Sequence, residues 1–263
     1  MYILGVDIGN TNTVFGVFNA NDDLEILHHW RTVTRRDRTS DELGIYLLGF
    51  LEFAGIKLDQ IQTSIYSSVV PSFSPIVERM LQSYFNAEPV RVDHTGDLPL
   101  RLRYLQPHEI GADRLVNATA AMTIYGGDLI CVDLGTATTI SVIHGDEFMG
   151  GSIAPGLKMS IETLSNRTAR LPPIEFRRPP GGVIGRSTVE ALESGFFYGW
   201  LGLLREIITT IRREQPERNY RVVATGGLSN LFQSEAEGLL DEVDPLLTLK
   251  GLKIIYRYQQ GQG

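Results

Sequence analysis

Two segments of the chain share one pattern, in which an apolar stretch ends in Asp-x-Gly and continues into small polar residues. The first, Ile3–Thr13, reads ILGVDIGNTNT, and the second, Leu129–Thr139, reads LICVDLGTATT. Glycine lets the backbone turn tightly and approach a ligand closely, while backbone N–H groups and Thr or Asn side chains can donate hydrogen bonds to phosphate oxygens. Each Asp offers a carboxylate to a cation, directly or through water. The pattern therefore predicts a nucleotide-phosphate site built from two hairpins.

The elements around these two segments indicate a duplicated architecture. Strands are expected at 2–8, 13–19 and 24–32 in the first half, and at 129–134, 138–144 and 147–153 in the second. In both halves, helices then alternate with strands, which is typical of an α/β protein. A helix over 107–125 connects the halves, so we expect an N-terminal phosphate-binding half at 1–106 and a C-terminal half at 107–263.

Further helices are predicted from capping residues and apolar periodicity. They cover about 39–54, 71–85, a stretch after Gly156, the long segment 187–214, and a last helix opened by Gly226-Gly227. The Pro- and Gly-rich stretch 171–185 is the best candidate for a mobile loop.

Composition excludes several classes of protein. The 263 residues carry a formal net charge of -7, which disfavours nucleic acid as a partner unless a basic stripe is present. The one dense basic run, 35–38, is short and is expected to be a solvated loop. A single Cys131 excludes an internal disulfide, and no segment is long and apolar enough for a membrane span. We therefore expect a cytoplasmic protein without nucleic-acid or membrane partners.

Taken together, the motifs resemble a known superfamily. Two Asp-Gly-Thr-type hairpins, a connecting helix and a late Gly-Gly turn are similar to the acetate and sugar kinases, actin and the heat-shock ATPases. That resemblance implies two duplicated ribonuclease H-like (actin-like ATPase) domains with a central cleft. Over nearly its whole length the chain resembles the type III pantothenate kinases. The motifs that carry this resemblance, in chain order, are Asp7–Thr13, Gly111–Arg114, Asp133–Thr139, Gly150–Gly156, Gly185–Thr188 and Thr225–Gly227.

The resemblance assigns a phosphate site to the two hairpins. It implies ATP with Mg²⁺, held by Asp7 through water, and a monovalent cation, K⁺ or NH₄⁺, held by Asp133. It also places the adenosine-binding elements in the C-terminal half. The residues expected to bind the ATP phosphates are Asp7, Ile8, Gly9, Asn10, Thr11, Asn12, Thr13, Val14 and Thr136.

The resemblance also implies a pantothenate site, in which Asp113 accepts the proton of the substrate hydroxyl. The residues expected to line it are Tyr104, Gly111, Ala112, Asp113, Arg114 and Thr188. The family further implies a homodimer with the helix 187–214 at the interface. One local departure is Arg186-Ser187, where many members have Lys-Asn.

The same residues have structural alternatives. Either hairpin alone could be an ordinary β-turn, and Asp113-Arg114 could be an ion pair or a cap on a helix. Asp133 could be a turn carboxylate without a metal. Thr188 could simply begin a helix, since Ser187 and Glu190 fit a cap. The aromatic cluster 196–200 is expected to pack in a core or a dimer rather than on a base.

Three functions remain open from the residues. The first is ATP-dependent phosphorylation of pantothenate to 4'-phosphopantothenate, the opening step of coenzyme A biosynthesis. The second is another enzyme on this scaffold, a sugar kinase or a polyphosphate phosphatase; repressor-related sugar kinases carry a Cys-rich zinc motif that one cysteine cannot form. The third is a non-catalytic nucleotide-binding regulator. Because all the motif residues are present, we expect the pantothenate kinase.

Overall fold

The chain forms two compact units in a computed structural model that describes residues 1–19, 24–85, 88–233, 236 and 238–261. Unit 1 comprises 1–125, 146–148 and 246–263, and unit 2 comprises 126–145 and 149–245. Each unit is built on its own sheet. The boundary that we predicted between residues 106 and 107 concerns the duplicated halves and stays a prediction.

The sheet of unit 1 has the strand order β3-β2-β1-β4-β5. β1 pairs antiparallel with β2 and parallel with β4, and β2 pairs antiparallel with β3. The strands are β1 (Tyr2–Ile8), β2 (Asn12–Asn19), β3 (Ile26–Val33), β4 (Ile61–Ser68) and β5 (Val90–Arg91).

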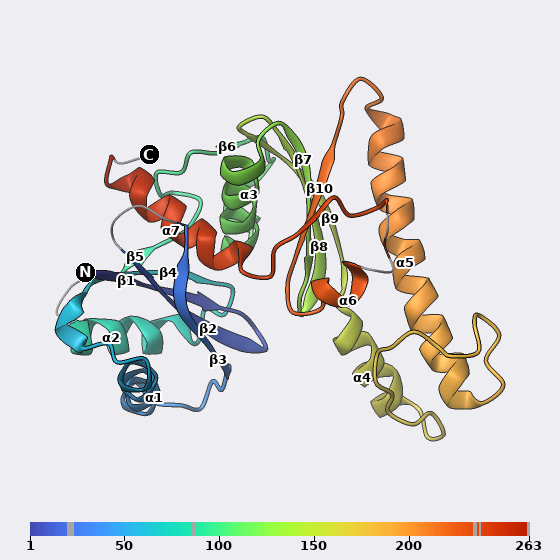
Figure 1. Cartoon of the computed structure of the whole chain (residues 1–263), viewed down its shortest axis with the longest axis horizontal. Coiled ribbons are helices and arrows are strands. Elements are labelled where there is room, and N and C mark those ends of the chain that lie inside the picture. The colour runs from blue at the N-terminus through green and yellow to red at the C-terminus, as the bar shows by residue number, and fades with distance from the viewer. Residues whose placement is uncertain (20–23, 86–87, 234–235, 237, 262–263) are drawn as a thin grey trace. The chain divides into compact units, whose positions relative to one another are not determined.

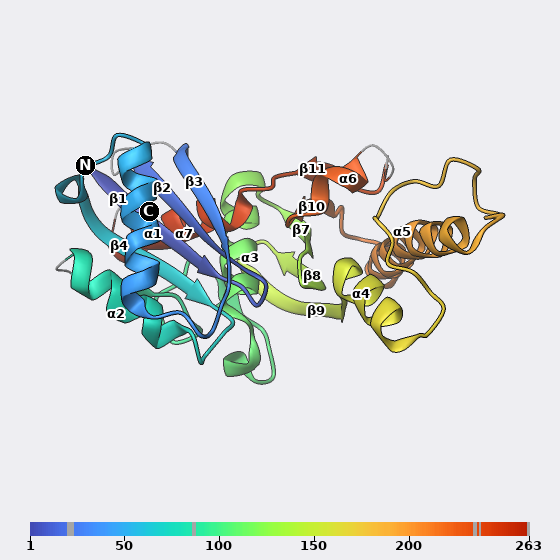
Figure 2. The same ribbon diagram turned by 90° about the horizontal axis from the view of Figure 1, so that it is seen from below.

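Helices cover both faces of this sheet (Figures 1 and 2). Because side chains alternate along a strand, Leu4, Val6 and Ile8 face one way and pack with residues of α1 and α2. Ile3 faces the other way and packs with residues of α3 and α7. The helices of this unit are α1 (Ser40–Phe53), α2 (Ser74–Phe85), α3 (Ala112–Tyr125) and α7 (Leu247–Gln259), with short 3-10 turns at Leu58–Gln60 and Pro107–Glu109.

Unit 2 repeats the topology of unit 1. Its strands run in the order β11-β10-β7-β8-β9, with β7 antiparallel to β8 and parallel to β10. The two-residue strand β6 (Arg101–Leu102) pairs with Glu147 and Phe148 at the start of β9. The strands are β7 (Asp128–Leu134), β8 (Ala137–His144), β9 (Glu147–Pro155), β10 (Arg221–Thr225) and β11 (Glu242–Val243).

One face of the second sheet packs against α4 (Leu157–Arg167), α5 (Thr188–Glu214) and α6 (Ser229–Gln233). The apolar spacing of α5 explains this, since Phe197, Leu201 and Leu204 lie on one side of the helix and are buried. The common strand order of the two sheets confirms the predicted duplicated α/β fold.

The structure corrects two predicted elements. The helix predicted over 107–125 begins only at Ala112, after a 3-10 turn. The helix after Gly226-Gly227 is the short α6 and is not the last, because α7 follows it. α7 was missed, although its buried Leu252 and Ile255 have helical spacing.

Candidate active site

The carboxylate of Asp7 lies on the α3 and α7 side of the first sheet. The alternation of β1 places Asp7 on the same side as Ile3, and the register pairs it with Ser67 on β4. The Ser67 hydroxyl donates a hydrogen bond of 2.8 Å to Asp7 Oδ1. Burial, together with the nearby charge of Asp113, raises the pKa of Asp7 to about 6, although the Ser67 bond and Arg31 oppose the rise.

Asp113 is brought to the same place by the first turn of α3. Its Oδ1 accepts a hydrogen bond of 2.7 Å from the backbone N–H of Arg114. A Cβ on Gly111 would lie 2.5 Å from that oxygen, so glycine leaves the room that the carboxylate occupies. Burial raises the pKa of Asp113, and the Arg114 N–H and guanidinium counteract this only in part. The raised pKa makes this carboxylate a stronger proton acceptor than an exposed aspartate.

Phe148 contacts two of the predicted substrate residues of unit 1. Its buried ring lies edge-on to Tyr104, with 6.1 Å between ring centroids, and the Arg114 guanidinium lies over the Phe148 ring at 5.2 Å from its centroid. One aromatic ring thus holds Tyr104 and Arg114. The sequence pattern did not single out Phe148, because a buried phenylalanine in a strand is ordinary.

The first predicted phosphate loop is a tight turn between β1 and β2. The Gly9 N–H donates a hydrogen bond of 3.0 Å to the Asn12 carbonyl, and Asn10 and Thr11 are exposed at the tip. Ile8 and Thr13 are fully buried, so their side chains belong to the interior. The loop therefore presents the side chains of Asn10 and Thr11, together with its backbone, to a ligand.

The second loop is the corresponding turn of unit 2 and is one residue shorter. The Gly135 N–H donates to the Ala137 carbonyl over 3.1 Å, next to Asp133 and Thr136. Gly226 has a φ of 93°, and a Cβ there would lie 2.5 Å from Asp133 Oδ1. A Cβ on Gly156 would lie 2.0 Å from the Thr136 carbonyl oxygen. Two of the glycines singled out in the sequence are therefore required by close approach to this loop.

Thr188 is an exposed residue at the first position of α5. Ser187 caps the helix by accepting a hydrogen bond of 3.2 Å from the Glu190 N–H. Capping is thus carried by Ser187, which leaves the Thr188 hydroxyl available to a ligand. The preceding stretch 171–185 is tied to α5 by an Arg177–Glu193 ion pair of 2.7 Å and a Ser194–Val183 hydrogen bond of 2.6 Å.

The donor set fits Mg²⁺ better than a transition metal. Within the described ranges no group of three or more His, Cys, Asp or Glu side chains could enclose a metal ion. Mg²⁺ is commonly held by one or two carboxylates together with waters and the phosphates of a substrate. Asp7, whose pKa is raised by burial and by the nearby charge of Asp113, offers a carboxylate that matches this requirement on the protein side.

The duplicated fold and its two turns define the class of actin-like ATPases and sugar kinases. A Campylobacter jejuni structure described as a candidate Baf family transcriptional activator aligns with a TM-score of 0.60 and 21% identity, covering 98% of this chain and 99% of that one. A candidate N-acetylmannosamine kinase from Listeria monocytogenes aligns with a TM-score of 0.55 and 14% identity over the whole of both chains. At these identities the likeness concerns the fold alone.

Sequence comparison gives the particular family. The family model of type III pantothenate kinase matches residues 3–210. The type III pantothenate kinase of Geobacillus kaustophilus (strain HTA426) is 43% identical over 255 residues, which is 97% of this chain and 96% of the relative. The chain belongs to the type III pantothenate kinase family.

Proposed function

We infer that this protein transfers the γ-phosphoryl group of ATP to the primary hydroxyl of pantothenate. The product is 4'-phosphopantothenate, and the reaction opens coenzyme A biosynthesis. Family membership carries this assignment, and the kinase uses ATP with Mg²⁺. The family and its substrates favour the cytoplasm as its location, and no described helix is long and apolar enough to cross a membrane.

Asp113 is the general base in the mechanism that we propose. Phosphoryl transfer depends on alignment of the reactants, neutralisation of the phosphate charge and an oriented nucleophile. Asp113 can accept the hydroxyl proton because burial raises its pKa, while the Arg114 N–H fixes one of its oxygens. This pairing of a fixed oxygen with a raised pKa is the observation that supports the assignment.

The remaining predicted site residues bind and orient. Asp7 would hold Mg²⁺ through water, and the ion would neutralise charge on the phosphates. The turns at Gly9–Asn12 and Gly135–Ala137 would offer N–H groups to phosphate oxygens, assisted by Thr136. Tyr104 and Arg114, held by Phe148, would bind pantothenate. The family resemblance also supports Thr188 of unit 2 as a residue that binds pantothenate.

The reaction is tested by ADP release from the purified protein with pantothenate, glucose, glycerol or acetate as acceptor. We expect activity with pantothenate alone. Activity with glucose and not with pantothenate would favour a sugar kinase, and ATP binding without turnover of any acceptor would favour a regulator. Either result would overturn the proposed function.

We propose a monovalent cation beside Asp133. The carboxylate lies at the end of β7, and the close approach of Gly156 and Gly226 brings backbone to the same turn. A K⁺ or NH₄⁺ ion there would offset repulsion among the ATP phosphates. These observations all concern residues of unit 2, and the family resemblance supports the same cation site.

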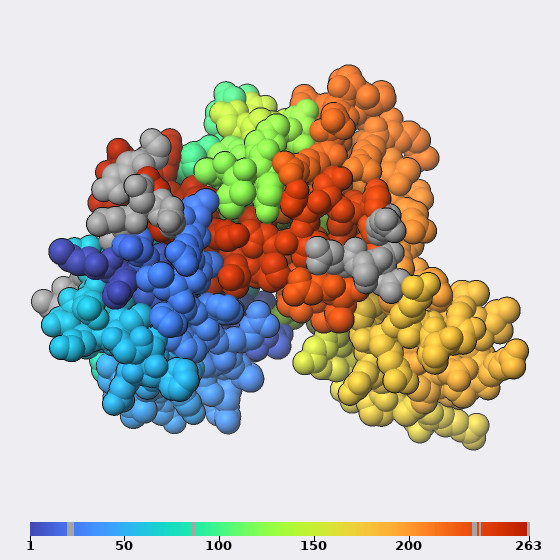
Figure 3. Space-filling model, viewed as in Figure 1, coloured from blue at the N-terminus to red at the C-terminus, as the bar shows by residue number. Residues whose placement is uncertain are grey.

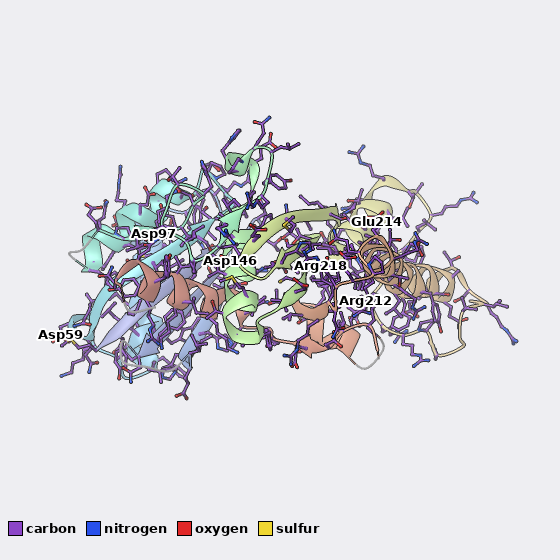
Figure 4. The ribbon with its side chains drawn as sticks, turned by 90° about the horizontal axis from the view of Figure 1, so that it is seen from above. Asp59, Asp97, Asp146, Arg212, Glu214 and Arg218 are labelled. Atoms are coloured by element: carbon purple, nitrogen blue, oxygen red, sulfur yellow. The ribbon has the colours of Figure 1, made fainter. Side chains whose placement is uncertain are left out.

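Exchange of K⁺ for Na⁺ at constant ionic strength is expected to lower the rate of ADP release strongly. Asp133→Ala should abolish the difference between the two ions, because the carboxylate that selects the site is gone. Glu214→Ala removes an exposed carboxylate from the same unit (Figure 4) and should leave the response to K⁺ intact. Equal rates in K⁺ and Na⁺ for the unmodified protein would contradict the cation site.

An apolar groove on α5 supports the homodimer that we propose. Its volume is about 380 Å³, and it lies beside α4, whose atoms are yellow in Figure 3. Apart from the adjacent residues and backbone of α5 itself, no described atom lies within 4 Å of a Cβ built on Gly195 or Gly199, so a neighbouring helix could approach closely there. The groove is lined by Leu164, Ala191, Leu192, Gly195, Phe196, Gly199, Trp200 and Leu203.

The burial of α5 changes which residues can test the interface. The aromatic cluster 196–200 was expected in a core or a dimer. Its member Phe197 is only 3% exposed and belongs to the core of unit 2, so its replacement by Glu would disrupt folding. Trp200 is partly buried and donates a hydrogen bond of 3.2 Å from Nε1 to Thr138 Oγ1. A substitution at either residue would therefore disturb unit 2 itself, so it could not test the dimer interface alone.

Gly199→Glu should convert the dimer into a monomer of about 29 kDa, as measured by sedimentation velocity. The substitution removes no contact within the chain, and outside an interface it should be neutral or slightly stabilising, since glycine disfavours helices. Gly49→Glu on α1 is the matched control, because a Cβ on this helical glycine also meets open space. A dimer that tolerates Gly199→Glu, or an unmodified protein that sediments as a monomer, would contradict the interface.

A further inference from the structure

Thr34 contacts the first phosphate loop at three points. Its backbone N–H donates to the Thr11 carbonyl over 2.9 Å, and its hydroxyl donates to the Gly9 carbonyl over 2.7 Å. The same hydroxyl lies 2.9 Å from Thr13 Oγ1. Thr34, the residue after β3, thus bonds the loop at Gly9 before the tip, at Thr11 in the tip and at Thr13 after the tip.

The direction of these bonds follows from the number of protons. A hydroxyl carries one proton and two acceptor lone pairs. Because the Thr34 proton is used by the Gly9 carbonyl, the Thr13 hydroxyl must donate to Thr34. The buried Thr13 side chain therefore supports the loop through its hydrogen bond to Thr34.

These bonds add to the hydrogen bond that closes the turn itself. In that bond the Gly9 N–H donates to the Asn12 carbonyl. The exposed tip, Asn10 and Thr11, depends on its neighbours for a fixed position, and phosphate binding by N–H groups requires such a position. Arg36 adds a hydrogen bond of 3.3 Å from Nη2 to Asn10 Oδ1.

We propose that Thr34 is a positioning residue for the nucleotide phosphates. Its hydroxyl, through Gly9 and Thr13, presets the β1–β2 loop in the conformation that binds ATP, and it does not itself touch substrate. The inference rests on the proposed function insofar as this loop is the phosphate site. No pattern in the sequence marks Thr34, because a Thr after a strand is ordinary.

Thr32 provides a matched control two residues before Thr34. It lies in β3, opposite Thr13 in the register, and like Thr34 it is half-buried. Among the described residues its Oγ1 has no hydrogen-bond partner. Thr→Val at 32 and at 34 makes the same chemical change, but only the change at 34 removes bonds to the loop.

The test measures Mg-ATP binding by calorimetry and the KM values for ATP and pantothenate for four proteins: unmodified, Thr34→Val, Thr34→Ser and Thr32→Val. We expect Thr34→Val to raise the Kd and the KM for ATP about tenfold, with the KM for pantothenate unchanged. Thr34→Ser keeps the hydroxyl and should restore ATP binding to within about twofold. Thr32→Val should bind ATP like the unmodified protein.

Three outcomes would overturn the inference: unchanged ATP binding in Thr34→Val, an equal loss in Thr32→Val, or no rescue by Ser. If Thr34→Val does not fold, Thr34→Cys keeps a weak donor of similar size and should raise the Kd about threefold. Loss of ATP affinity in Thr34→Val, with no pantothenate turnover by the unmodified protein, would refute the proposed function and leave the role of Thr34 standing.

Discussion

Asp113→Asn is expected to lower kcat for pantothenate phosphorylation by about 10²- to 10⁴-fold. Asparagine keeps the shape of the side chain and can still accept the Arg114 N–H bond, but it cannot take up the hydroxyl proton. Binding of Mg-ATP and the thermal midpoint should change little. The measurement is steady-state ADP release with saturating pantothenate, combined with ATP titration.

Asp59→Asn is the control for this prediction. Asp59 is an exposed carboxylate of the same unit (Figure 4), and its replacement should leave kcat unchanged. If Asp113→Asn kept a near-normal kcat, Asp113 would orient the substrate without accepting its proton. The proposed mechanism would then be wrong, although the family assignment would stand.

Asp7→Asn is expected to lower kcat/KM about 10²-fold, because a carboxylate for Mg²⁺ is lost where charge must be neutralised. The same variant should melt at a higher temperature than the unmodified protein at pH 7.5. The expected rise in melting temperature has a physical reason. The ionised Asp7 carboxylate is buried beside Asp113, and this raises the free energy of the folded protein.

The pH dependence of this stabilisation has a definite sign. The pKa of Asp7 is about 6 in the folded protein and 3.8 as its ordinary value, so between these values the folded state binds more protons than the unfolded state. The stability contributed by the protonated carboxyl is complete below about pH 3.8 and is lost as the pH rises through 6. Asparagine cannot ionise, so its advantage in thermal midpoint should be large at pH 7.5 and vanish near pH 4.

Melting curves in the absence of ATP and Mg²⁺, recorded across this pH range, check the expectation. A variant that melts at a lower temperature at every pH would indicate that Asp7 stabilises the fold in its ionised form. Ser67→Ala tests the effect of the hydrogen bond apart from that of burial. Loss of this 2.8 Å bond should raise the pKa of Asp7 further. The fall in activity on acidification should then begin at a higher pH than in the unmodified protein.

The duplicated α/β fold and the two Asp-x-Gly turns could be predicted from the sequence. The signals for both lie within short segments of the sequence. Each turn needs glycine at defined positions, and each strand shows its own apolar pattern. The same holds for the capping box of α1, where the Glu42 N–H donates to Thr39 Oγ1 and the Thr39 N–H donates to Glu42 Oε2. Such features depend on neighbours a few residues away, which is why they can be read from the chain.

The residues that support the site could be recognised only in the folded structure. Ser67, Phe148 and Thr34 act on groups 60, 34 to 44 and 21 to 25 positions away, respectively, and nothing in their own sequence neighbourhoods marks them. The structure also divided α5 between a buried core side, with Phe197, and a groove with open glycines. These assignments depend on strand register and helix packing, which bring distant segments together and which local pattern does not encode.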